Sequence, residues 1–320
     1  MHSINVDIGE GKFLPHIEAK VITNEELKRI ITRPDARSIT RFVTSVNISF
    51  NYMGSEEFIV LVDTPGTGDT QSCEVDVANA IGILKAISMA DSVHPILIFG
   101  YKNFGNRYEI LKAQFQYYSR MIINVKNNIR HFNYFFTQVP DEWQDKLGSI
   151  LVTMKENFTP SEKLDKSLED FVIDVQKKVK QNKARVLHPL DGNRDEVLSD
   201  VYENDPITDP RSAFKLNIGQ KSNEAVRLQF GIHEKAIIAA VKRRESELAA
   251  YKLEELQKLK DIFKHDPNYA KQYEEILKQI GAIVKDNFET NVKLLSRCLT
   301  FGNSLNMDDI SSFNAAFLFA

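Results

Sequence analysis

Short apolar runs alternate with longer segments of helical periodicity between residues 45 and 188, and this alternation limits the fold more than any other feature. Residues 45–63 predict a β-hairpin, because SVNISFNY alternates apolar and polar residues, MGSE supplies a turn and FIVLV is wholly apolar. Further strands are predicted at residues 95–99, 132–136 and 184–188. Strands that alternate with helices favour a parallel sheet covered on both faces, and the hairpin adds one antiparallel strand. The predicted fold class is therefore α/β with a mixed, mostly parallel sheet.

The segments between the predicted strands carry apolar residues at the spacing of a helix. In residues 74–90, for example, Val77, Ile81, Leu84 and Ile87 recur every three or four positions. Helices are predicted on the same grounds at residues 74–90, 109–124, from Asp141 onward, and 160–179. The α/β domain is expected to extend over residues 1–192.

The remainder of the chain has a different character. A polar stretch with several Pro and Gly residues has weak periodicity and is predicted as a connector over residues 193–222. Two long helices, separated by HDPN at residues 265–268, are predicted to form an antiparallel hairpin over residues 223–300, followed by a tail at 301–320. The second helix has apolar residues at steps of three or four: Tyr273, Leu277, Ile280, Val284, Phe288, Val292 and Leu295.

The overall composition argues against several classes of protein. Lys and Arg (41) nearly balance Asp and Glu (44), so charge gives no reason to expect a nucleic-acid partner. The longest apolar runs, FIVLV and PILIF, are far shorter than the roughly 20 residues of a membrane-spanning helix. Only two cysteines occur, Cys73 and Cys298, which suits a reducing compartment, and a cytoplasmic protein is expected. The basic pair Lys177-Lys178 is predicted to lie on a solvated helix face.

One predicted strand ends in a carboxylate. Asp63 follows FIVLV directly, and Gly66 comes three residues later, after Thr64 and Pro65. In α/β folds, ligands bind at the carboxyl ends of the strands. An aspartate in this position helps to hold magnesium in P-loop nucleoside-triphosphatases, and a glycine lets its backbone N–H approach the terminal phosphate. The alternative interpretation is a structural turn that joins a strand to a helix.

The stretch LVDTPGTGDT resembles the switch II motif of large Ras-like GTPases, especially septins, dynamin relatives and immunity-associated GTPases. The hairpin before it resembles strands two and three of that fold. Upstream, residues 37–40 (RSIT) resemble the S-x-T of switch I. The resemblance implies GTP and Mg²⁺ as ligands, with Thr40 and Asp63 serving the metal and Gly66 the γ-phosphate. Thr64 belongs to the same implied nucleotide site.

Residues 135–141 (FFTQVPD) lie where the base-reading motif [N/T]-K-x-D of this family follows a strand. The resemblance implies that Thr137 and Asp141 contact the base, since a carboxylate can accept hydrogen bonds from both N–H donors of guanine's edge. The sequence departs from the motif in two ways, because Gln138 replaces the lysine and Asp141 comes one residue late. The preference for guanine over adenine is therefore left open.

The strongest element of the family, the phosphate loop G-x-x-x-x-G-K-[S/T], has no match in the sequence. The nearest segment is GEGK at residues 9–12, but Val6 replaces the first glycine and Phe13 the hydroxyl that binds magnesium. In the Ras-like strand order the first strand lies between the third and fourth, so its loss leaves two interior edges unpaired. Three explanations stay open: the loop lies upstream of Met1 in a longer polypeptide, INVDI replaces the strand in a pseudo-GTPase, or the resemblance arose by chance.

Two functions from different classes follow from these observations. The first is a GTP-binding, GTPase-like domain, which binds nucleotide weakly and hydrolyses it only if a phosphate loop is supplied. The second is a non-catalytic pseudo-GTPase scaffold that acts through its carboxyl-terminal helices. Those helices are then expected to bind a protein partner or a second copy of the chain.

Overall fold

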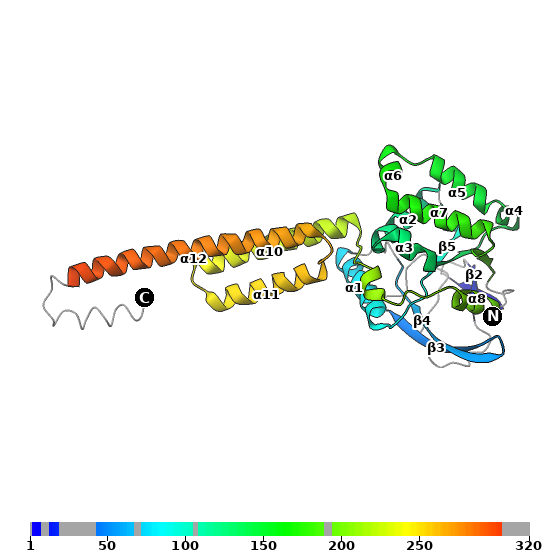
Figure 1. Cartoon of the computed structure of the whole chain (residues 1–320), viewed down its shortest axis with the longest axis horizontal. Coiled ribbons are helices and arrows are strands. Elements are labelled where there is room, and N and C mark those ends of the chain that lie inside the picture. Colours follow the sequence, from blue (N-terminus) through cyan, green and yellow to red (C-terminus); the bar gives the residue numbers. More distant parts are fainter. Residues whose placement is uncertain are drawn as a thin grey trace. The chain divides into compact units, whose positions relative to one another are not determined.

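The computed structural model of the chain describes six stretches: residues 2–7, 13–18, 43–66, 72–104, 108–188 and 194–302. The chain divides into two compact units, one over residues 1–223 and the other over residues 224–320. The strands belong to the first unit, and long helices make up the second (Figure 1). No helix of the described stretches is long and apolar enough to cross a membrane.

The predicted hairpin is confirmed. β3 (Thr44–Tyr52) and β4 (Ser55–Asp63) pair antiparallel along their full length. Their turn places Met53 at a φ of 50° and Gly54 at a φ of 86°. The Gly54 N–H donates to Oδ1 of Asn51 over 3.0 Å. Because glycine adopts positive φ without a steric cost, MGSE closes the hairpin as the sequence predicted.

Three parallel strands form a second sheet, in the order β5 (Ile96–Gly100), β6 (Asn133–Thr137) and β7 (Arg185–Leu187). All three strand predictions are confirmed. In the register of β5 and β6, Gly100 lies beside Thr137. The carboxyl ends of these strands therefore meet at one edge of the sheet, which is where α/β folds bind ligands.

Helices connect these strands, as the periodicity predicted. α1 (Cys73–Met89) joins the hairpin to β5, and α2 (Glu109–Met121) follows β5. The helix predicted at residues 160–179 is divided at Asp165, whose carboxylate accepts a hydrogen bond from the Leu168 N–H over 3.1 Å. The other helices of this region are η2 (Tyr101–Phe104), α3 (Val125–Asn128), η4 (Ile129–His131), α4 (Asp141–Gln144), α5 (Leu147–Glu156), α6 (Pro160–Leu164) and α7 (Lys166–Lys180).

An aromatic core holds the parallel sheet against α2 and α7. Phe99 of β5 and Phe136 of β6 are fully buried, with ring centroids 5.7 Å apart. The ring of Phe115, on α2, lies 5.1 Å from Phe99 and 5.1 Å from Phe171 of α7. Each such buried side chain stabilises the fold by roughly 1.5–3 kcal/mol relative to exposure to water. This core fixes the positions of the ends of β5 and β6.

The hairpin is attached to the rest of the unit by α8 (Arg194–Glu203). The ring of Tyr202 lies 5.5 Å from that of Phe50 and 5.0 Å from that of Tyr52, and its hydroxyl donates to Glu57 Oε2 over 3.0 Å. Both α8 and α9 (Pro210–Ala213) lie in the segment predicted as a connector. That prediction underestimated the order here, because α8 is short and only part of one face is buried.

The expectation of one mixed sheet is wrong for the described residues. β3 and β4 form a sheet of their own, β5 to β7 form another, and β1 (His2–Asp7) pairs only with β2 (Phe13–Glu18). INVDI therefore does not take the place of a strand between β4 and β5. Within the described stretches, β4 and β5 each have a second edge without a partner strand.

Apolar side chains are exposed on both of these strands. On β4, Phe58 is 73%, Val60 57% and Val62 45% exposed, and on β5 Ile98 is 57% exposed. Strands of a parallel α/β sheet are normally buried on both faces, and their apolar side chains are covered by neighbouring elements. The exposure of these four residues is what a sheet without its central strand predicts.

The second unit contains three helices rather than the predicted two: α10 (Gln220–Lys242), which begins in the first unit, α11 (Ser246–Ile262) and α12 (Pro267–Gly302). The break before Pro267 is confirmed. The first predicted helix is instead interrupted at Arg244, which has a φ of 62°. No glycine or proline marks this break, so the sequence gave no signal for it. The core of the unit consists of Phe230, Ile237, Ala240, Leu256, Tyr269 and Ile276.

Candidate functional site

Asp63 is the last residue of β4 and is half-buried. Thr64 and Gly66 after it are exposed, whereas Pro65 is buried. A Cβ atom added to Gly66 would meet nothing within 4 Å, so the backbone is open to approach there. Buried Pro65 anchors the segment, and the carboxylate before it and the glycine after it remain near the surface. Of the residues predicted for the site, Thr40 lies outside the described residues, as does the stretch 67–71.

The loop between β6 and α4 carries the two residues predicted to contact the base. Thr137 ends β6 and is half-buried, and Asp141 begins α4 and is exposed. Oδ1 of Asp141 accepts a hydrogen bond from Nε2 of Gln144 over 2.9 Å. Between them, Gln138 has a φ of 59°, a left-handed conformation that costs a residue with a side chain roughly 1–2 kcal/mol. Strained backbone of this kind is concentrated at functional sites.

Tyr202 relates the strand of Asp63 to the parallel sheet. Its hydroxyl holds Glu57 near the start of β4, and its ring stacks on that of His94, just before β5, with centroids 6.2 Å apart. The two strands therefore start at the same side chain. Asp63 and Gly100 each lie six residues further on, roughly 20 Å of strand length from that start. The structure thus brings Thr137 and Asp141 into one loop, whereas Asp63 ends a strand of the other sheet.

The residues of the candidate site fit magnesium only with ligands from a nucleotide. Among the described side chains, no group of three or more His, Cys, Asp or Glu could hold a metal ion. Magnesium is usually held by one or two carboxylates together with water and substrate phosphates. Asp63 can supply one such carboxylate. The remaining protein ligand implied by the sequence, Thr40, is not among the described residues.

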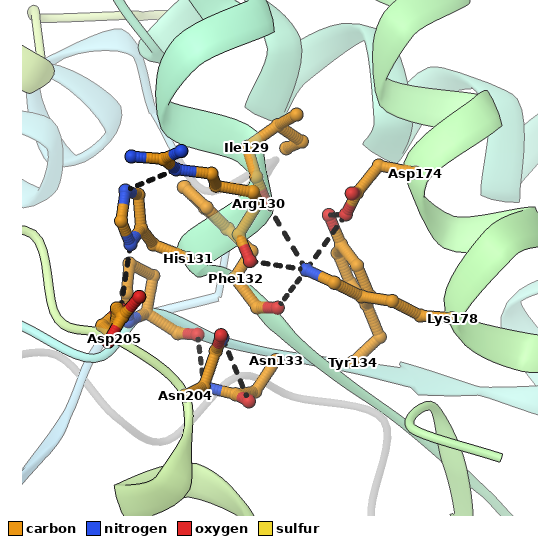
Figure 2. A network of polar contacts seen from close by, with 11 residues as sticks. Ile129, Arg130, His131, Phe132, Asn133, Tyr134, Asp174, Lys178, Asn204 and Asp205 are labelled. Atoms are coloured by element: carbon orange, nitrogen blue, oxygen red, sulfur yellow. Dashed lines mark hydrogen bonds and ion pairs between the residues drawn. The ribbon is translucent and has the colours of Figure 1, made fainter. Parts of the chain in front are cut away.

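A buried polar network lies at the other end of β6 (Figure 2). Lys178 of α7 donates from Nζ to the carbonyl oxygens of Ile129 (3.4 Å), Arg130 (2.8 Å) and Phe132 (2.7 Å), and it pairs with Asp174 Oδ2 at 2.9 Å. The carbonyls at the end of a short helix such as η4 have no partners within the helix. The lysine therefore satisfies the backbone where η4 turns into β6.

Tyr134 completes this network. Its hydroxyl donates to Asp174 Oδ2 over 2.9 Å, and the Lys178 ammonium lies 5.0 Å from the centre of its ring. Burial raises the pKa of Tyr134 well above its usual value, and the charge of Asp174 adds to this effect. Burial lowers the pKa of Lys178, and Asp174 opposes this change. Two charges and a hydroxyl are thus held in fixed positions with their hydrogen bonds satisfied.

The same end of the sheet has further contacts to the chain after α8. His131 Nδ1 lies 2.7 Å from the Asp205 carbonyl oxygen, and Asn204 Nδ2 donates to Asn133 Oδ1 over 3.4 Å (Figure 2). Burial lowers the pKa of His94, which lies nearby, and contacts with the backbone oppose this shift. These residues tie the strand starts together. Their groups are engaged with one another rather than directed at an open site.

The prediction that Lys178 lies on a solvated helix face is wrong. Lys178 is buried, although its neighbour Lys177 is exposed, as predicted for the pair. A signal was present in the sequence, because position 178 continues the buried stripe of α7, which consists of Leu168, Phe171, Val172 and Val175. The aspartate one turn earlier, Asp174, supplied the partner for the charge.

Comparisons of the chain with protein-family models, with curated proteins and with solved structures find no match.

Proposed function

We propose that the first unit is a Ras-like, GTP-binding domain that uses Mg²⁺ and has no phosphate loop of its own sequence. The observation that carries this proposal is the order of the described elements. An antiparallel hairpin ends in Asp63, and a helix and three parallel strands with intervening helices follow. This is the order expected of such a domain after its first strand and phosphate loop.

The residues of the site then have separate roles. Asp63 would hold the magnesium ion, and the open backbone at Gly66 would contact the terminal phosphate. Magnesium supplies neutralisation of the charge that develops on the phosphate oxygens. The exposed carboxylate of Asp141 would accept hydrogen bonds from the base, with Thr137 beside it. No residue is assigned to the activation of water, so the proposal concerns binding first and hydrolysis second.

Weak binding is expected for the chain as it stands. A phosphate loop contributes several backbone N–H groups and a lysine to the phosphates. Without them, the affinity depends on one carboxylate, one glycine and the base contacts. We expect dissociation constants in the micromolar range or weaker.

Binding of a fluorescent GTP analogue in the presence of Mg²⁺ tests this proposal. We expect Asp63→Ala to weaken binding by about tenfold or more, equivalent to ~1.4 kcal/mol. Glu56→Ala is the matched control, because Glu56 is an exposed carboxylate at the opposite end of the same strand. Equal affinities of the Asp63 and Glu56 variants would contradict the assigned site. An adenine analogue, compared in the wild type and Asp141→Ala, measures the preference for guanine.

The second candidate function is a scaffold without nucleotide, and an observation in the second unit favours it. Large apolar residues are exposed along α12, among them Val284 at 53% and Phe288 at 67%. Such a surface is typical of protein interaction sites. Absence of nucleotide binding by the wild-type chain would favour this function over the first.

A further inference from the structure

Four exposed apolar side chains of α12 lie on one line along the helix. Leu277, Val284, Phe288 and Leu295 are each more than 40% exposed. At about 100° per residue they lie within roughly 40° of one another around the helix axis. We call these four residues the α12 stripe. It extends over roughly 27 Å of helix.

The face that carries the α12 stripe is not covered by the other helices of its unit. Tyr269, Tyr273 and Ile276 of α12 are buried in the core of the unit, so a different face packs against the neighbouring helices. Near Asn291, whose Oδ1 accepts a hydrogen bond from Arg244 at 3.4 Å, α12 passes the end of α10. Beyond that point, in the red part of Figure 1, α12 continues past both α10 and α11.

The spacing of the α12 stripe is symmetric about position 286. Leu277 and Leu295 each lie nine residues from Asp286, and Val284 and Phe288 each lie two residues from it. An interface between two identical chains related by a two-fold axis requires a surface that is complementary to itself. Two antiparallel α12 helices centred at this position would place Leu277 opposite Leu295 and Val284 opposite Phe288.

Charges along α12 favour the antiparallel arrangement over the parallel one. Glu275 and Arg297 each lie eleven residues from Asp286, so each would lie opposite the other in a second copy. A parallel pair in register would bring Glu275 beside Glu275 and Arg297 beside Arg297, which is unfavourable. Asp286 itself lies about half a turn away from the stripe, so the two copies of its carboxylate do not meet.

Room for the largest side chain of the stripe is present in the helix. Gly281 is exposed, and a Cβ atom added to it would meet nothing within 4 Å. In the antiparallel pair, Phe288 of one copy packs over Val284 of the other, one turn from Gly281. A glycine at this place lets a phenylalanine ring approach the backbone closely.

We propose that α12 is a homodimerisation helix, which pairs antiparallel with α12 of a second copy of this chain through the α12 stripe. The occupant of this surface is thus a second copy, argued from the symmetry of the stripe and of its charges. The proposal does not depend on nucleotide binding, because none of its residues belongs to the candidate nucleotide site.

Sedimentation of the full chain over a range of concentrations tests the dimer. We expect the wild type to reach twice the chain mass of 36.6 kDa. Phe288→Asp places an unpaired carboxylate in the contact, and we expect it to raise the dissociation constant of the dimer by about a hundredfold or more. Leu228→Asp on α10 is the matched control, because Leu228 is similarly exposed (66%) but lies outside the stripe.

Because Phe288 and Leu228 are exposed, both variants should keep the helix content of the wild type, which circular dichroism measures. A wild type that stays at 36.6 kDa at every concentration would overturn the proposal. Equal weakening of the dimer by the two substitutions would overturn it as well.

Charge reversal tests the antiparallel direction. Glu275→Arg and Arg297→Glu should each weaken the dimer several-fold, since each brings like charges together. The double variant should recover the wild-type dissociation constant, because the opposite charges face each other again. In a parallel dimer the double variant would still bring like charges together, so a lack of recovery would overturn the antiparallel arrangement.

Discussion

The two ends of β6 are built in opposite ways. At its start, Lys178 and Tyr134 are buried, and their polar atoms are bonded to the protein itself. At its end, Thr137 is half-buried and Asp141 is exposed, and between them Gln138 has a left-handed backbone. The strand between the ends is almost wholly buried.

The difference separates groups that hold the fold from groups that can serve a ligand. A buried charge whose hydrogen bonds are satisfied by the protein has no capacity left for another molecule. An exposed carboxylate beside a strained loop, at the carboxyl end of a parallel strand, keeps that capacity. We therefore expect substitutions at the start of β6 to change stability and substitutions at its end to change binding.

The largest effect is expected for Lys178→Met, which removes the charge at the start of β6. Asp174 would stay half-buried without its cation, and three backbone carbonyls would lose a donor. We expect the free energy of unfolding to fall by about 3–5 kcal/mol. Urea unfolding followed by the fluorescence of Trp143, the only tryptophan, measures this change in the first unit.

Lys177→Met is the control for this prediction. Lys177 is exposed on the same helix, and its loss should change stability by less than about 0.5 kcal/mol. If the two variants lose similar amounts of stability, the network in Figure 2 does not anchor the start of β6, and the contrast between the ends fails.

A smaller effect is expected from pH, through His94. Burial lowers the pKa of His94 in the folded chain, whereas the unfolded chain protonates near the ordinary value of 6.5. The unfolded state thus binds more protons just below pH 6.5, and stability is lost as the pH falls through the folded pKa. The slope should stay below about 1.4 kcal/mol per pH unit, because the side chain is partly exposed.

Urea unfolding at pH 7 and at pH 5 measures this slope. His94→Phe keeps a ring against Tyr202 and should make the stability less dependent on pH. The same substitution at His188, an exposed histidine after β7, controls for the exchange of rings. An unchanged slope in His94→Phe would show that the proton taken up at low pH binds elsewhere.

The smallest effect is expected at the strained end of β6. Gln138→Gly relieves a φ of 59°, and we expect the free energy of unfolding to rise by up to about 1 kcal/mol. Asn124, before α3, has a φ of 49°, but asparagine accepts this conformation more readily. Asn124→Gly should therefore gain less. Urea unfolding compares the two variants, and a larger gain at Asn124 would argue against strain at Gln138.

The sequence predicts much of the first unit because its signals are local. The alternation in SVNISFNY, the apolar runs and the helical periodicity each act within a few residues, and the corresponding strands and helices are all present. The separation of the two sheets could not be read in this way, because strand pairing is a non-local property. The break at Arg244 was also missed, since a left-handed arginine has no sequence signature.

The candidate site is predictable only in part for a similar reason. Asp63, Thr137 and Asp141 could be assigned to strand ends from their order in the chain, and the structure places them there. The role of Lys178 depends on carbonyl groups that lie about 50 residues earlier in the sequence. No periodicity in a single helix reveals such partners, although it did indicate that the position was buried.

The apolar strands at the gap between β4 and β5 have a practical consequence. Exposed Phe58, Val60 and Ile98 on strands with free backbone groups form a template that other polypeptides can extend. In a crowded solution such a template recruits unfolded chains and begins cross-β aggregation. The solubility of this protein is thus expected to fall steeply with concentration, and charged substitutions on β4 should delay precipitation without loss of the fold.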